Sequence, residues 1–158
     1  QDLRIAGPVQ AHLFAATSGQ DSDFIIKLID VFPEKGQESV YSKDDKASWA
    51  QSLDGYEFPV AMEVRRGRYL RAFSHATPLQ PNKVTEWPVS LRDHDHVFLK
   101  GHRLMVQVQS TWFPLIDRNP QTWVPSIPDA KGTDFKAATQ RIYTTPQAAS
   151  NITLPVLQ

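Results

Sequence analysis

The chain has 158 residues, 41% of them hydrophobic, and its 17 basic residues balance its 17 acidic ones. This length and composition predict a single globular domain over residues 1–158. The balanced charge argues against nucleic acid as a partner, and the arginine-rich stretch at residues 65–71 is read as a solvated or ion-paired face. The absence of cysteine excludes disulfides, thiol nucleophiles and cysteine-bound zinc. No apolar run is long enough to cross a membrane, so no membrane partner is expected.

Strand-like patterns dominate the first half of the chain. Residues 9–16 alternate with a period of two and predict a half-buried strand that opens after Gly7 and Pro8. Residues 23–32 are apolar on both parities, which predicts an inner strand with both faces covered, ended by a turn at Pro33. Residues 37–59 have a poor pattern and are predicted to be a long loop with one short strand near residues 39–41.

The second half continues this pattern. Strands are predicted at residues 60–64, 67–73 and 83–91, the last at an edge or a bulge because it contains Pro88. Residues 102–112 carry the strongest alternation and predict a central strand. The prolines of residues 114–134 are too dense for a helix and indicate an extended, ordered loop. Strands at residues 137–143 and 151–156, separated by a turn at 146–150, complete an all-β antiparallel sandwich or barrel.

Two groups of side chains have the chemistry of metal ligands. His94 and His96 could share one face of a strand, but a metal would need further ligands, so a polar turn leading into a strand is favoured. Asp21 and Asp23 resemble the start of a calcium loop, yet apolar residues follow Asp23 at once. We expect Asp23 to accept hydrogen bonds from an arginine or from backbone N–H groups, and we expect neither a metal nor another cofactor.

The sequence lacks the local signature of an acyl hydrolase. Such an enzyme needs a nucleophile on a tight elbow, typically Gly-x-Ser-x-Gly, and neither Ser18, Ser110 nor Ser150 has that setting. A glycine-rich phosphate loop is also missing. We therefore expect no catalytic residue in this chain.

Three stretches together resemble the C-terminal domain of the X-prolyl dipeptidyl peptidase and cocaine esterase family of serine hydrolases. The first is a D-x-D-F-x-x-K-L-x-D-V-x-P run that carries Asp21, Asp23, Lys27 and Asp30. The second runs from residue 97 to 122, and the third covers residues 138–143 with Ser150 and residues 154–156. The family residues of the second stretch are Gly101, His102, Arg103, Asp117, Arg118 and Asn119. Within the family, the chain is most similar to α-amino acid ester hydrolases and glutaryl-7-aminocephalosporanic acid acylases.

The resemblance implies a jelly-roll β-sandwich of the galactose-binding-domain-like kind. In this family it packs against an upstream α/β-hydrolase domain and its cap, where the catalytic serine, aspartate and histidine lie. Relatives are often exported, which favours a periplasmic or secreted protein. Family jelly rolls begin with strands that precede the point matching Leu3, so we expect this chain to lack an edge of its own sheet. A second copy, as a homo-oligomer, or another segment is then needed to cover that edge.

The conspicuous side chains are predicted to be structural. His102 and Arg103 are expected to be buried beside Asp23, Asp30 or Asp117, because a buried charge persists only when it is paired. Arg118 and Asn119 are expected to cap backbone groups in the proline-rich loop.

A patch of Trp112, Phe113 and Trp123 suits docking to another domain better than sugar stacking. Two functions remain: a non-catalytic module of a serine acyl hydrolase, which is favoured, and an independent carbohydrate-binding module. A metal-dependent enzyme centred on His94 and His96 is disfavoured.

Overall fold

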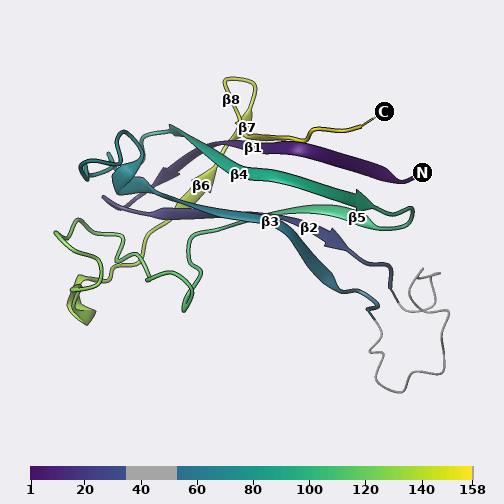
Figure 1. Cartoon of the computed structure of the whole chain (residues 1–158). Coiled ribbons are helices and arrows are strands. Elements are labelled where there is room, and N and C mark those ends of the chain that lie inside the picture. Colours follow the sequence, from purple (N-terminus) through teal and green to yellow (C-terminus); the bar gives the residue numbers. More distant parts are fainter. Residues whose placement is uncertain (35–52, 158) are drawn as a thin grey trace, which may run out of the picture.

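The computed structural model describes residues 1–34 and 53–157. These residues form strands and two short 3-10 helices but no α-helix. Two antiparallel sheets face each other as the layers of a sandwich (Figure 1), which confirms the predicted all-β, jelly-roll-like class. None of the described helices is long and apolar enough to cross a bilayer.

The first sheet is built around β1 (Leu3–Thr17), which pairs with β4 (Thr85–Phe98), β6 (Gln140–Ile142) and β9 (Asn151–Thr153). β1 extends the strand predicted at residues 9–16 at both ends, and β4 begins two residues after the predicted start at 83 and continues to Phe98. Among the described strands β4 pairs only with β1, and Pro88 lies opposite His12 in that pairing. The predicted edge position of Pro88 is therefore confirmed. The stretch at residues 93–96, predicted to be a polar turn, belongs instead to β4.

The second sheet has the order β3-β2-β5, with β3 at Glu57–Arg66, β2 at Asp23–Val31 and β5 at Arg103–Gln109. All residues of β2 except Lys27 are buried, so the predicted inner strand is confirmed. The prediction that residues 102–112 form the central strand is wrong. β5 ends at Gln109 and, among the described strands, pairs only with β2.

Four further predictions concern shorter segments. The expected turn near residues 146–150 is a hairpin of β7 (Thr144–Thr145) and β8 (Ala148–Ala149). The expected strands at 137–143 and 151–156 shrink to the three residues of β6 and of β9. The strand predicted near residues 39–41 lies outside the described residues.

Residues 67–73 are not the predicted strand. Gly67–Tyr69 form the 3-10 helix η1, which turns the side chain of Arg68 into the interior. A Cβ atom on Gly67 would lie 2.6 Å from the carbonyl oxygen of Ser22 and 2.8 Å from atoms of Leu79 and Trp87. Only glycine fits this close approach, so Gly67 allows the chain to turn at η1 against Ser22.

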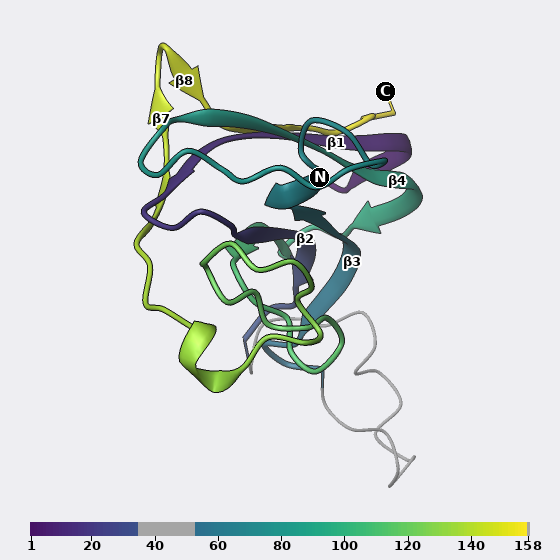
Figure 2. The same cartoon turned by 90° about the vertical axis from the view of Figure 1, so that its left-hand side faces the viewer.

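The core lies between the two sheets, where Phe24 of β2 meets Trp87 of β4 edge to face with ring centroids 4.7 Å apart. The proline-rich segment after β5 lies beneath the second sheet, on the side away from the first (Figure 2). It contains the 3-10 helix η2 (Gly132–Asp134) and no strand, as predicted for an ordered loop. Both faces of the second sheet are thus covered, which explains why β2 is buried.

Candidate functional site

The polar residues of β2 and its approach gather into two clusters at opposite ends of the strand, each centred on buried carboxylates of this segment. The arginine cluster, at the start, consists of Asp21, Asp23, Arg66, Arg68, Asp117 and Asn119. The histidine cluster, at the end, consists of Asp30, His96 and His102. Asp21, Asp23, Asp30, His102, Asp117 and Asn119 were all singled out from the sequence, and the structure brings them together in these two groups.

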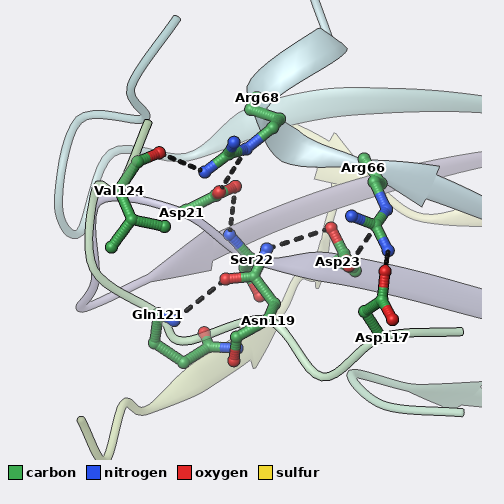
Figure 3. A network of polar contacts seen from close by, with 9 residues as sticks. All are labelled: Asp21, Ser22, Asp23, Arg66, Arg68, Asp117, Asn119, Gln121 and Val124. Atoms are coloured by element: carbon green, nitrogen blue, oxygen red, sulfur yellow. Dashed lines mark hydrogen bonds and ion pairs between the residues drawn. The ribbon is translucent and has the colours of Figure 1, made fainter. Parts of the chain in front are cut away.

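Arg68 and Asp21 form the inner pair of the arginine cluster (Figure 3). The Nε atom of Arg68 donates to Asp21 at 2.8 Å, and its Nη2 atom donates to the carbonyl oxygen of Val124 at 2.9 Å. The guanidinium also lies 4.9 Å from the ring centroid of Trp123. One buried arginine therefore links the approach to β2 with the proline-rich loop.

Asp23 and Arg66 form the outer pair. Asn119 donates to Asp23 at 3.1 Å, and Arg66 lies 3.7 Å from Asp23 and 3.9 Å from Asp117. Burial raises the pKa of Asp23 to about 6, although Arg66 and the hydrogen bond from Asn119 act in the opposite direction. The carboxylates of Asp21 and Asp23, which a calcium ion would need as ligands, are thus paired with the guanidinium groups of Arg68 and Arg66.

Asp30 holds the two imidazoles of the histidine cluster. His102 Nδ1 lies 2.8 Å from one carboxylate oxygen, and His96 Nε2 lies 2.9 Å from the other. An ionised carboxylate only accepts hydrogen bonds, so both of these ring nitrogens carry the proton. Within the described residues, no serine or threonine hydroxyl bonds to either imidazole, so this acid–histidine pair lacks the nucleophile of an acyl transferase.

His94 does not join His96 in a shared site. Its Nε2 atom pairs with the carbonyl oxygen of Leu91 at 2.8 Å, whereas His96 turns to Asp30. In the part of the chain that the structure describes, no group of three or more histidine, aspartate or glutamate side chains is arranged to hold a metal ion. The two imidazoles therefore have different hydrogen-bond partners in the described structure.

The remaining family residues have separate roles. Lys27 lies over the ring of Trp112, 4.8 Å from its centroid, and Gly101 has the positive φ of 93° that the turn before β5 requires. Arg103 is exposed, so its predicted burial is wrong: it begins an edge strand whose far side carries no described neighbour.

Arg118 and Asn119, which are adjacent in the proline-rich loop, differ in role. The Oδ1 atom of Asn119 accepts a hydrogen bond from the backbone N–H of Gln121 at 2.9 Å, which is the predicted capping. Arg118 is exposed and stacks on Phe113 and Phe135 at 5.5 and 5.6 Å, so the prediction that it caps backbone groups is wrong.

Arg66, Arg68 and His96 are the partners that sequence reasoning missed. Arg66 and Arg68 belong to the stretch that was interpreted as a solvated or ion-paired face. Both are ion-paired, with Asp23 and Asp21, but Arg68 is buried and does not lie on a face. The usable signal was Gly67 between two arginines, because a glycine there permits a turn that sends one of them inward.

Comparison with known proteins gives consistent results. A family described as the X-Pro dipeptidyl-peptidase C-terminal non-catalytic domain matches residues 1–153. A cocaine esterase from Rhodococcus sp. (strain MB1 Bresler) is 31% identical over 156 residues, covering 99% of this chain and 24% of that protein.

Solved structures agree with this match. An aminopeptidase from the marine sediment archaeon Thaumarchaeota archaeon has a TM-score of 0.88 and 42% identity, over 100% of this chain and 24% of its own. An α-amino acid ester hydrolase has a TM-score of 0.86 and 46% identity, over 99% of this chain and 24% of its own. The chain therefore spans about a quarter of the length of these relatives.

Proposed function

The chain belongs to the family of X-Pro dipeptidyl-peptidase C-terminal non-catalytic domains, and on this premise we propose that it is the β-sandwich module of a serine acyl hydrolase. In this proposal the module packs against an α/β-hydrolase domain and its cap, and those parts carry the chemistry. The observation that carries the proposal is the family match over residues 1–153, in a chain only a quarter as long as its relatives.

The names of the relatives support a hydrolase as the parent protein. They are an esterase, an aminopeptidase and an ester hydrolase, enzymes that cleave ester or peptide bonds. Neither buried cluster of this chain combines a nucleophile with its base, which agrees with a supporting role. The parent is accordingly proposed to be a peptidase, esterase or acylase whose active site lies outside this chain.

The side of β5 that has no neighbour among the described strands supports an incomplete sheet. In the antiparallel pairing with β2, Leu104, Val106 and Val108 lie opposite Asp30, Leu28 and Ile26 and so share the inner face. In a closed sandwich such residues are buried, yet Val106 is 39% exposed and Leu104 is 38% exposed. The described residues of the first sheet therefore leave this part of the inner face partly uncovered.

An apolar groove follows this open side. Its volume is about 210 Å³, and it is lined by residues from both sheets and from the C-terminal strands: Ala11, Leu13, Ile26, Val106, Val108, Ile142, Ser150, Asn151 and Ile152. An unpaired strand edge beside such a groove can add another strand through backbone hydrogen bonds. We propose that strands from the preceding part of the same protein fill this place.

The loop after β5 supplies a second proposed contact. Phe113 is 66% exposed and Leu115 is 68% exposed, whereas Trp112 and Trp123 are half-buried beneath Lys27 and Arg68. The docking patch predicted from the three aromatic residues is therefore redrawn as Phe113 and Leu115. Neighbouring exposed apolar side chains of this size are typical of protein interfaces.

The proposal is tested by making this chain and the remainder of its natural polypeptide as two separate fragments. We expect the chain alone not to hydrolyse a p-nitrophenyl ester and not to react with a serine-directed inhibitor. The two fragments are expected to associate, and the double substitution Phe113→Asp with Leu115→Asp should weaken that association at least tenfold. Phe73→Asp, at a position that is 80% exposed elsewhere on the surface, is the control.

Two results would contradict the proposal. Ester turnover by the chain alone, abolished by the inhibitor, would show that it carries its own catalytic site. Saturable binding of glycans by the chain, together with no association between the fragments, would instead support the independent carbohydrate-binding module.

A further inference from the structure

A pocket of about 480 Å³ opens beside the histidine cluster. It lies where β2 and β4 end and where the turn before β5 returns. The residues that line it are Asp30, Phe32, Leu53, Tyr56, Phe58, Asp95, His96, Val97, Leu99 and His102. Its volume falls within the range of small-molecule sites, and the proposed function of the module does not use it.

Aromatic rings form one wall of this pocket. The centroids of Phe32 and Tyr56 are 6.1 Å apart, and those of Tyr56 and Phe58 are 6.5 Å apart. Phe58 in turn stacks on His96 at 5.8 Å. Tyr56 and Phe58 are exposed, so a ligand can reach their rings without displacing the core.

The polar side chains of the pocket are mainly hydrogen-bond acceptors, and only the phenol of Tyr56 can both donate and accept. Asp30 is only 2% exposed, and its ion-pair partners among the described residues are the two imidazoles, with no lysine or arginine. Since both imidazoles donate to Asp30, their other ring nitrogens are acceptors in the neutral form. Asp95 stands at the rim, paired with Arg4 at 3.0 Å. Among the described lining residues there is no lysine or arginine.

We propose that this pocket binds a primary ammonium group carried on an apolar stem. Such a group donates hydrogen bonds, matching the acceptors of the imidazoles, and its charge complements the buried carboxylate of Asp30. The faces of Tyr56 and Phe58 attract a cation and also pack against its stem. An anion meets no lysine or arginine among the described lining residues, since Arg4 is paired with Asp95 at the rim, and a neutral alcohol lacks the charge.

The test is calorimetric titration at pH 8 of the naturally encoded polypeptide that contains this chain. The probes are 2-phenylethylammonium and Nα-acetyl-lysine N-methylamide, which distinguish a free aromatic amine from a lysine side chain as the source of the ammonium group. The uncharged 2-phenylethanol and the anionic 3-phenylpropionate serve as matched comparisons. We expect saturable binding of at least one amine, at least tenfold tighter than either comparison.

Variants locate this binding. Tyr56→Ala combined with Phe58→Ala removes two exposed rings and should weaken amine binding at least tenfold. Phe73→Ala removes an exposed ring that does not line the pocket and should leave it unchanged. Equal binding of 2-phenylethanol, binding only of a neutral sugar such as methyl glucoside, or amine binding that survives the double substitution would each overturn the proposal.

Discussion

Asp21 and Arg68, which are 47 positions apart, form an ion pair of 2.8 Å in which the two side chains are 0% and 4% exposed. A charged pair so well shielded is sensitive to the loss of either member, because the remaining charge stays buried without its partner. This pair also holds the carbonyl oxygen of Val124, so it joins the sandwich to the proline-rich loop (Figure 3).

Arg68→Ala is expected to lower the free energy of unfolding by about 3–5 kcal/mol, the usual cost of breaking a buried pair on one side. Urea denaturation followed by tryptophan fluorescence measures this change. The control is Arg92→Ala, which breaks the pair with Glu63 where the arginine is 80% exposed, and it should cost less than about 1 kcal/mol. Equal changes in the free energy of unfolding for the two substitutions would show that the buried pair of Arg68 contributes no more to stability than an exposed pair.

Asp23 gives the chain a specific dependence on pH. Because burial raises the pKa of Asp23 from 3.8 to about 6, the ionised group is disfavoured in the folded state and the protonated group is not. A rise of this size corresponds to a penalty of about 3 kcal/mol, which is fully present above pH 6 and disappears as the pH falls towards 4. As the pH falls from 6 towards 4, the wild-type chain should therefore gain stability relative to Asp23→Asn.

Unfolding midpoints of the two proteins between pH 4 and pH 8 test this dependence. Comparison with Asp23→Asn cancels the other titrating groups, so only the change in the difference matters. The raised pKa of Asp23 would be refuted if the difference in unfolding midpoint stayed constant between pH 4 and pH 8. It would also be refuted if the wild type became less stable than Asp23→Asn on acidification.

His102 should contribute more stability than His12, although both are paired with a carboxylate. The side chain of His102, which is paired with Asp30, is 4% exposed. That of His12, which is paired with Glu86, is 43% exposed. We expect His102→Ala to cost at least about 2 kcal/mol, since a buried carboxylate loses a partner. His12→Ala should cost no more than about 1 kcal/mol. Thermal unfolding of the two variants compares them directly, and the reverse order would contradict the structure.

Gly67 should not tolerate even a methyl group. In Gly67→Ala the new Cβ would lie 2.6 Å from a backbone oxygen, which has no rotamer by which to move away. We expect a loss of about 1–3 kcal/mol, typical of overpacking. Gly132→Ala is the matched control, since nothing lies within 4 Å of a Cβ there, and it should be close to neutral. Denaturation midpoints decide between them, and a neutral Gly67→Ala would contradict the close approach of η1 to Ser22.

Local pattern was sufficient for the strands whose environment is uniform along their length. β2 was predicted because its apolar residues occupy both parities, and the edge position of β4 followed from Pro88. The strand expected at residues 67–73 failed because Arg68 bonds to Asp21, a contact across 47 positions that no local period encodes. Likewise, the sequence around Leu104 has the strongest alternation of the chain, and only the pairing shows that β5 lies at the edge of the described sheet.

The buried clusters were only partly predictable. A charged or polar residue inside an apolar run, such as Asp30 in β2, indicates that a partner must exist. It does not indicate which of several histidines supplies that partner. The choice of His96 and His102 over His94 depends on the register between β1 and β4 and on the turn at Gly101, both of which are tertiary features.

Hydrogen exchange at β5 shows whether this sandwich is a module that the rest of its protein completes. The amides of Arg103–Gln109 that do not bond to β2 are to be followed in this chain alone and in the naturally encoded polypeptide. We expect fast exchange of these amides in the chain alone and strong protection in the longer protein. Equally fast exchange in both would show that no strand is added at β5 and would contradict the claim.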